Sequence, residues 1–425
     1  MKRNNLKILI IGFTVFLLHN NVKAQFKIDA QYRPRFELRD GYQKLAADSA
    51  VPAAFVSQRT RITFGYETDK IKLKFTPQDI RTWGDEQTAG LNGGNGNDAS
   101  VDLFEGYAEI KIGAENWISV GRQQFIYDNN SLLSNANWNQ NGSSADAVIF
   151  KLSMSDWNIH IAGSWNALRA ESSDIVYPSS RIKTINFLWL NRKFNDQLTS
   201  SFLHVASGVT ETDTTNTLHF RQTTGLFGSY ILKDFKAQGD FYLQYGKNPQ
   251  DKNIMAFLFD ADLSYQVGKL MPGIAVSYLS GNSKTGNELE TDNLFDPLYR
   301  SRHGYFGSQD YFRDFSSNTK QGGLADYFIY FEYKISDALN IRNAAHYFQL
   351  AQTNSTTPDD KNLGFENDLL LKYKFASWGT VESGYSFFLP TEALKTLQGV
   401  EENKLSQFYY LQLILTPTLF KQEQQ

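Results

Sequence analysis

Basic side chains stand at alternating positions in the first part of the chain, where they share one expected face. They are Lys27, Arg33, Arg35, Arg39, Arg59, Arg61, Lys72 and Lys74. A planar guanidinium group presents a fixed fork of N–H donors that fits a carboxylate or phosphate group. A row of such groups along a channel wall would attract anions and lower the barrier to their passage. These residues therefore favour binding and passage of anions over bond-making chemistry.

The same arginines have a structural alternative, because acids lie at neighbouring positions. Ion pairs with Asp29, Glu37, Glu105 and Glu109 would brace a wall without touching any solute. Later segments place acids at the expected inward positions instead. These are Asp240, Asp260, Asp262, Glu366 and Asp368. We expect a lumen with separate basic and acidic walls and a net preference for anions.

Strands must position these residues, because apolar and polar residues alternate without a break from Phe26 to Arg39. Successive side chains of a strand point to opposite faces, so one face is apolar and the other charged. Strands of soluble proteins average about 5–6 residues. A strand that separates lipid from water needs roughly 9–11 residues with this pattern. The pattern predicts a transmembrane antiparallel β-barrel.

Similar alternation recurs along the chain and predicts about eighteen strands. They start near Phe26, Val56, Lys70, Leu103, Trp117, Ala145, Trp157, Lys183, Gln197, Leu218, Phe235, Met255, Pro272, Asp326, Leu339, Gly364, Gly379 and Ser406. Tight links such as Ser155-Asp156 and Lys233-Asp234 carry the Asp that turns favour. They alternate with long links: residues 40–55, 79–102, 128–144, 167–182, 282–325 and 389–405. Outer-membrane barrels have short periplasmic turns and long extracellular loops, and an even count leaves both termini in the periplasm.

Residues 1–24 have the features of a signal peptide, which leaves residues 25–425 as the barrel. Lys2, Arg3 and Lys7 precede an apolar stretch, and Val22-Lys23-Ala24 is a small-residue cleavage signal. The apolar stretch is shorter than the roughly 20 residues of a membrane anchor. We expect the cell outer membrane as the location and its lipid as a partner.

Composition excludes several other classes. The mature chain has 38 Lys+Arg, after removal of four from 42, against 45 Asp+Glu, a net charge of −7 that disfavours nucleic acid. Cysteine is absent, which rules out disulfides and thiolate metal sites. The histidines are scattered without a metal-like pair, and no Gly-x-Ser-x-Gly elbow occurs. We therefore expect no catalytic residue, metal or cofactor. A soluble secreted all-β protein and a barrel-embedded hydrolase are the weaker alternatives.

The stretch from Gly121 to Ala147 is dense in Asn, Gln and aromatic residues. Planar amides can hydrogen-bond to sugar hydroxyls, and aromatic faces can stack on sugar rings. The plainer interpretation is a polar external loop that folds into the mouth of the barrel. Composition alone leaves both open.

Several segments together resemble the alginate export family of outer-membrane porins. They are Tyr32–Glu37, Ser57–Arg61, Gln78–Gly84, Gly121–Ala147, Phe295–Tyr299, His303–Gly307 and Asp310–Phe312. The resemblance implies an eighteen-stranded monomeric barrel whose arginine-rich constriction passes a polyuronate. Carried over by position, the constriction would contain Arg33, Arg35, Arg59, Arg61, Arg81 and Arg122.

The leading hypothesis is a porin that passes an anionic polysaccharide or oligosaccharide, alginate-like, or other small anions by passive diffusion. The alternatives are a general nutrient porin and an adhesion or binding barrel that holds a partner with long loops, especially residues 282–325.

Overall fold

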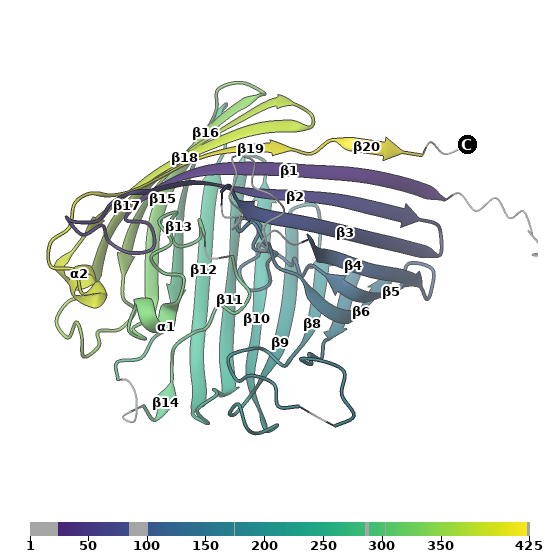
Figure 1. Ribbon diagram of the computed structural model, residues 1–425, viewed down its shortest axis with the longest axis horizontal. Coiled ribbons are helices and arrows are strands. Elements are labelled where there is room, and N and C mark those ends of the chain that lie inside the picture. The colour runs from purple at the N-terminus through teal and green to yellow at the C-terminus, as the bar shows by residue number, and fades with distance from the viewer. Residues whose placement is uncertain (1–23, 85–100, 174, 285–288, 302, 423–425) are drawn as a thin grey trace, which may run out of the picture.

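The computed structural model describes residues 24–84, 101–173, 175–284, 289–301 and 303–422. The expected signal peptide lies outside them except for Ala24, and so does most of the expected link 79–102. Eighteen long strands form one antiparallel barrel (Figure 1). Two further strands complete the described set: β14 is a two-residue strand within a loop, and β20 follows the last barrel strand.

The first nine barrel strands are β1 (Gln25–Asp40), β2 (Ala53–Glu67), β3 (Ile71–Thr82), β4 (Val101–Lys111), β5 (Trp117–Gln123), β6 (Ala145–Met154), β7 (Trp157–Gly163), β8 (Thr184–Lys193) and β9 (Leu198–Thr210). The others are β10 (Leu218–Leu232), β11 (Phe235–Lys247), β12 (Asn253–Tyr265), β13 (Leu270–Leu279), β15 (Leu324–Lys334), β16 (Leu339–Gln349), β17 (Asn362–Ala376), β18 (Gly379–Pro390) and β19 (Ser406–Leu415). The remaining elements are β14 (Thr291–Asp292), β20 (Thr418–Lys421), α1 (Phe315–Asn318) and α2 (Glu392–Gln398).

The sheet closes on itself because β1 pairs with both β2 and β19. Phe36 lies opposite Val56 on one side and Leu411 on the other. β20 also pairs with the start of β1. Closure removes the free edges that an open sheet would expose, so the strand backbones find partners within the barrel.

The predicted alternation is confirmed by exposure. Phe257 and Phe259 on β12 are exposed on the outside, whereas Asp260, the residue that follows Phe259, is buried. Pleating produces this difference, because neighbours along a strand point to opposite faces. The outer face is therefore apolar and the inner face polar, as a wall between lipid and water requires.

The two ends of the barrel differ, as predicted. β1 begins and β20 ends at the same end, which we call the turn end, on the right of Figure 1. Its links are short, such as Lys233-Asp234 between β10 and β11. The opposite loop end carries α1, α2 and β14. No helix within the described ranges has the length and apolar character to cross a membrane.

Predicted strand starts lie within three residues of the observed ones. Two expected links begin four residues from their predicted starts. The link expected at Asp128 begins after β5, which ends at Gln123, and the link expected at Asp79 begins after β3, which continues to Thr82. β3 continues past Pro77 because its register with β4 shifts between Thr76 and Pro77. A proline lacks a backbone N–H and is tolerated in a sheet at such a bulge.

An outward charge should disrupt the barrel. Phe241 lies midway along β11, is 45% exposed, and faces Phe259 across the strands. We expect Phe241→Arg to lower the free energy of unfolding from lipid by about 2–4 kcal/mol, the cost of an arginine near the bilayer midplane. Ala170→Arg in an exposed loop is the control and should change little. Urea titration of folding into vesicles, followed by the heat-dependent gel shift of folded barrels, measures both. Equal stability of the two variants would contradict a lipid-facing Phe241.

Candidate functional site

The loop between β5 and β6, residues 124–144, crosses the interior of the barrel. It contacts strands on distant parts of the wall. Asp128 accepts hydrogen bonds from Ser201 Oγ on β9 (2.6 Å) and Trp189 Nε1 on β8 (3.0 Å). Asn129 Nδ2 donates to Asp240 Oδ2 on β11 (2.7 Å). A loop that reaches these strands and also β1 can do so only through the lumen.

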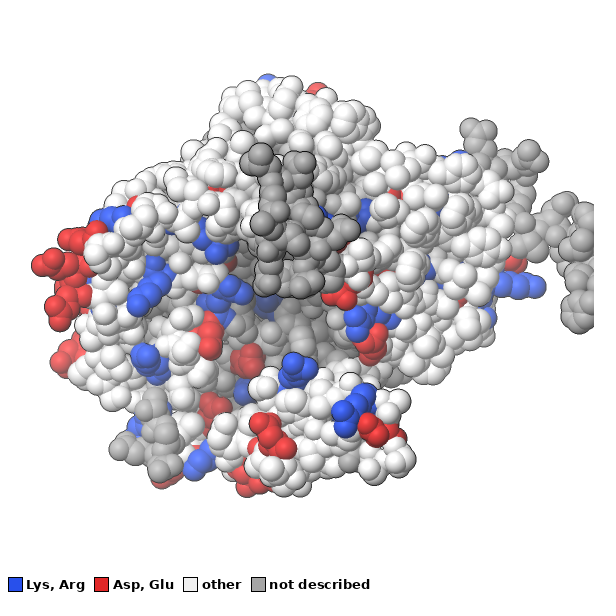
Figure 2. All heavy atoms as spheres, in the orientation of Figure 1, with Lys and Arg blue, Asp and Glu red and all other residues white. Residues whose placement is uncertain are grey.

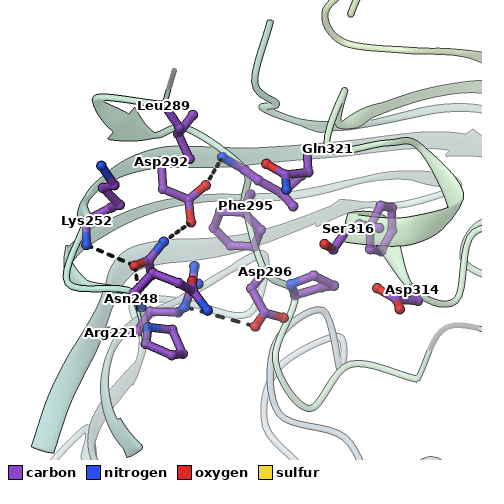
Figure 3. A pocket seen from close by; sticks show the side chains of 15 residues that line it. Arg221, Asn248, Lys252, Leu289, Asp292, Phe295, Asp296, Asp314, Ser316 and Gln321 are labelled. Atoms are coloured by element: carbon purple, nitrogen blue, oxygen red, sulfur yellow. Dashed lines mark hydrogen bonds and ion pairs between the residues drawn. The ribbon is translucent and has the colours of Figure 1, made fainter. Parts of the chain in front are cut away.

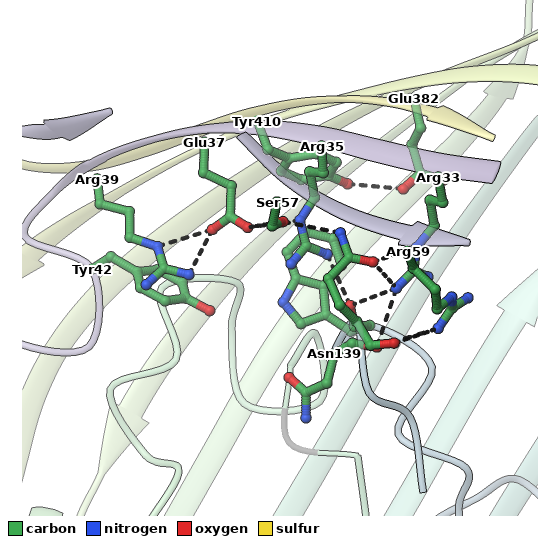
Figure 4. Close-up of polar contacts among 12 residues, drawn as sticks. Arg33, Arg35, Glu37, Arg39, Tyr42, Ser57, Arg59, Asn139, Glu382 and Tyr410 are labelled. Atoms are coloured by element: carbon green, nitrogen blue, oxygen red, sulfur yellow. Dashed lines mark hydrogen bonds and ion pairs between the residues drawn. The ribbon is translucent and has the colours of Figure 1, made fainter. Parts of the chain in front are cut away.

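Arginines of β1 and β2 hold this loop by its backbone oxygens (Figure 4). Arg33 Nη1 donates to the carbonyl oxygen of Asn137 (2.7 Å), and Arg35 Nη1 donates to that of Trp138 (2.8 Å). Arg59 Nη1 reaches the carbonyl oxygens of Asn139 and Gln140, both at 3.3 Å. Arg61 Nη2 donates to that of Asn141 (2.9 Å). Consecutive carbonyl groups from 137 to 141 thus accept hydrogen bonds from four guanidinium groups, which we call the arginine cluster.

Strand register explains why the cluster forms. Arg33 lies directly opposite Arg59, and Arg35 lies opposite Ser57. Like charges opposite one another destabilise a strand pair, so an acceptor must lie near both. Gln140 fills that role: its Oε1 accepts from Arg33 Nη2 (2.9 Å), and its backbone carbonyl oxygen accepts from Arg59 Nη1 (3.3 Å). The loop therefore supplies what the two strands lack.

The arginine cluster keeps a net positive charge. Glu37 pairs with Arg35 (2.8 Å) and with Arg39 (2.6 Å). The hydrogen bonds of Arg33 and Arg59 go to neutral oxygens, and these side chains are 3% and 0% exposed. Direct contact between a solute and these two guanidinium groups is thus blocked by the loop. Their charge still acts on the lumen, since the interior screens it less than water would.

A second part of the wall, between β11 and β17, is the acidic wall, and it holds the described parts of a second loop, residues 280–323. Glu366 Oε1 on β17 accepts from Gln309 N (2.8 Å), and Asp368 Oδ2 accepts from Ser308 Oγ (2.9 Å). On β12, Asp260 pairs with Arg300 of this loop (3.0 Å). The arrangement mirrors the arginine cluster: cations hold backbone oxygens of one loop, and anions hold backbone N–H groups of the other.

The two loops meet inside the barrel. The ring of Trp138 is stacked on that of His303, with centroids 3.6 Å apart and planes 8° from parallel. The guanidinium of Arg35 lies 3.8 Å from the Trp138 ring centroid. His303 Nδ1 lies 3.0 Å from Asp310 Oδ1. The lumen is therefore narrowed where the basic wall, the two loops and the acidic wall come together.

Asp310 also ties the second loop to the loop between β1 and β2. Its other oxygen accepts from the hydroxyl of Tyr42. Burial, and then the charge of Asp310, raise the pKa of Tyr42 well above its usual value. The hydroxyl therefore stays protonated and remains a donor across the working pH range.

The remaining predicted basic residues do not touch loop 124–144. Arg39 stands nearest the loop end and lies over the ring of Tyr42. Lys74 pairs with Glu105 (2.7 Å). Lys72 pairs with Glu67 (2.9 Å), closer to the turn end. These three line the inner face in the phase that alternation predicts.

Arg81 and Arg122 lie apart from the arginine cluster. Arg81 is opposite Gln58, whereas Ile80 is opposite Arg59, so Arg81 occupies the other face of β3. It pairs with Asp79 (2.7 Å). Arg122 pairs with Asp146 (2.7 Å) and borders a cavity of about 420 Å³ near the loop end that Asn141 and Gln78 also line.

Sequence reasoning missed Arg300 and His303 as lumen residues, because neither lies in an alternating segment. Both line two cavities of about 350 Å³ each, one that includes Trp138 and one that includes Asp262. Figure 2 shows Lys, Arg, Asp and Glu gathered around a hollowed part of the molecule, below an almost uncharged region. Across the described ranges, no group of three or more His, Cys, Asp or Glu side chains is arranged to hold a metal ion.

Gly307 allows the second loop to approach the acidic wall. It has φ +76°, and a Cβ there would lie 2.5 Å from the Glu366 carboxylate. We expect Gly307→Ala to detach the loop and to speed its cleavage by added protease. Gly304→Ala is a matched control, because Gly304 has φ +78° but nothing within 4 Å of the added carbon. Equal cleavage rates in the two variants would show that the contact with Glu366 does not hold the loop.

The sequence model of the alginate export family matches residues 23–408. No curated protein is similar to the chain in sequence. Among solved structures, the chain resembles OccAB1 of Acinetobacter baumannii with a TM-score of 0.62 at 13% identity, covering 93% of this chain and 97% of that one. It resembles OpdL of Pseudomonas aeruginosa with a TM-score of 0.63 at 11% identity, covering 93% and 99%. A BenF-like porin from Pseudomonas fluorescens Pf-5 gives 0.62 at 11%, covering 93% and 99%. At these identities the likeness shows the fold, which is that of outer-membrane porins.

Proposed function

The chain belongs to the alginate export family, and from this premise we propose that it passes acidic oligosaccharides or other small organic anions across the outer membrane by passive diffusion. It is an outer-membrane barrel of the porin type. Two features of the lumen would decide which solutes pass. Anion preference comes from the arginine cluster, and the size limit comes from the two loops that meet in the lumen.

One observation carries the proposal: Arg33, Arg59 and Arg61 all donate to neutral oxygens of loop 124–144. Ion pairing would have cancelled their charge, whereas carbonyl dipoles solvate it and leave it in place. A low-dielectric wall around such a charge focuses its field into the lumen and raises the local concentration of anions. An anion near the constriction is thus stabilised, and a cation is not.

The loops also bear on the adhesion alternative. Residues 124–144 and the described parts of 280–323 direct their contacts to the inner wall, as Asn129 does at Asp240 and Gln309 does at Glu366. A barrel that captures partners outside the cell would present these loops outward. Narrowing of the lumen favours oligomers and small anions over a thick polymer bundle.

Two further parts of the proposal follow from the chain ends and the closed sheet. We take residues 1–24 as the signal that directs export, which would be removed to leave residues 25–425. We take the channel as a monomer, because β1 and β19 pair within one chain and a single barrel encloses its own lumen.

Removing two arginines tests the origin of selectivity. In planar bilayers, Arg33→Ala/Arg59→Ala should lower the chloride-to-potassium permeability ratio by about threefold or more, because focused charge is lost. Its single-channel conductance should rise, because loop 124–144 loses hydrogen bonds. Arg342→Ala is the control: this lumen arginine lies on the acidic wall near Glu332 and does not contact that loop. It should shift selectivity less and leave conductance unchanged. A native channel that prefers cations would refute the anion pathway.

Blocking measurements test the class of solute. Trimers of uronic acid should reduce the current through the native channel at lower concentration than neutral trisaccharides of equal size, because their carboxylates are drawn to the arginine cluster. The difference should shrink in Arg33→Ala/Arg59→Ala. Equal block by charged and neutral trimers in the native channel would favour a general nutrient porin.

A further inference from the structure

Another cavity lies at the loop end, away from the arginine cluster. Its volume is about 510 Å³, within the range of ligand sites. Most of its lining comes from three parts of the chain: the link from β11 to β12, the segment 292–297 that begins in β14, and residues 314–316 where α1 begins (Figure 3). Arg221 of β10 lines it as well. A solute that approaches from outside the cell meets this cavity before it reaches the constriction.

The walls of the cavity are built in advance by hydrogen bonds. Asp292 accepts from Asn248 Nδ2 and from Asn282 Nδ2, both at 3.0 Å. Gln244 on β11 is bonded twice to the backbone of Asp296, from its Nε2 to the carbonyl oxygen (2.6 Å) and from the amide N–H to its Oε1 (2.9 Å). These bonds join three segments that are distant in the sequence. These segments are therefore ordered before a ligand arrives. Binding then costs little conformational entropy, which favours affinity.

The lining of the cavity combines hydrogen-bond acceptors with apolar side chains. Three carboxylates line the cavity, those of Asp292, Asp296 and Asp314, against two cations, Arg221 and Lys252. Ionised carboxylates accept hydrogen bonds and cannot donate. Pro249, Leu289 and Leu294 supply half-buried apolar surface between them, and Phe295 and Phe315 are buried beneath it. Figure 3 shows the Phe295 ring between Asp292 and Asp296, with Ser316 and Gln321 across from it.

This chemistry selects among possible ligands. An anion would face an excess of carboxylates. A bare metal ion would meet proline and leucine surface and the guanidinium of Arg221, which lies 4.0 Å from Asp296. A sugar ring offers several hydroxyl donors for the carboxylates and a C–H face for the apolar side chains. We propose that this cavity is a docking site for an uncharged sugar unit.

The consequence for transport rests on the proposed function. The mouth would retain a solute by its hydroxyl groups, and the constriction would then select it by charge. Together the two sites favour an acidic oligosaccharide that contains neutral units over a simple inorganic anion. Binding at the mouth itself does not depend on the arginine cluster.

Asp314→Asn tests the site without disturbing the fold, because Asp314 caps α1 and asparagine caps helices equally well. Calorimetric titration of maltotriose into the detergent-solubilised barrel is the readout. We expect binding by the native protein and an affinity about tenfold lower in the variant, since a sugar hydroxyl would then bond to a neutral amide oxygen instead of a charged carboxylate. Asp359→Asn, the same charge change in the exposed link between β16 and β17, should bind like the native protein.

A polyethylene glycol of equal length should not bind, because it has hydroxyl groups only at its ends. Binding of this polymer as tightly as maltotriose, or an unchanged affinity in Asp314→Asn, would overturn the sugar site. The selectivity of Arg33→Ala/Arg59→Ala is measured separately, so failure of the sugar site and failure of the anion pathway can be told apart.

Discussion

Hydrogen bonds from guanidinium groups to backbone carbonyl oxygens hold the interior of this barrel together. Strand pairing places Arg33 and Arg59 opposite one another, and among the described residues neither has a carboxylate at ion-pairing distance. Their charges are stabilised because loop 124–144 turns four consecutive carbonyl groups toward them. Without these bonds the loop would keep only its contacts with other strands, such as those of Asp128 and Asn129. The stacking of Trp138 on His303 would then be weakened.

The acidic wall completes the arrangement with the opposite polarity. Glu366 and Asp368 bind N–H and hydroxyl donors of loop 280–323, so this loop also lies inside. A lumen between a basic and an acidic wall carries an electric field across the path of the solute. Such a field orients a solute that has both charge and dipole. This geometry links the fold of the chain to the proposed passage of acidic sugars, and the cavity at the mouth adds a site that responds to hydroxyl groups.

Much of the fold could be predicted from the sequence, because the barrel imposes a period of two on every strand. The alternation in residues 26–39 determines which face of β1 carries the arginines. The alternation in residues 257–260 likewise determines which face of β12 carries Asp260. Arg81 entered the candidate set through the family resemblance alone. Arg81 is an odd number of residues from Lys72 and Lys74, so strict alternation places it on the other face of β3. The structure has it on that face.

The interior of the site could not be predicted in the same way. Loop segments have no period, so nothing in the sequence around Trp138 or His303 indicates that their rings stack. The pairing of Arg33 with Arg59 depends on the register between two strands, which the length of the intervening link sets. The density of amides from Gly121 to Ala147 was the one available signal, and it left open whether the loop lies inside or outside.

Thiol accessibility tests the inward loop most directly, because the chain has no cysteine of its own. Leu132 is buried and Asn139 is exposed within the same loop. In vesicles, with a membrane-impermeant maleimide, the account predicts that Leu132→Cys reacts only after unfolding and that Asn139→Cys reacts in the folded barrel. Equal, rapid labelling of both cysteines in the folded barrel would place the loop outside the lumen and contradict the account.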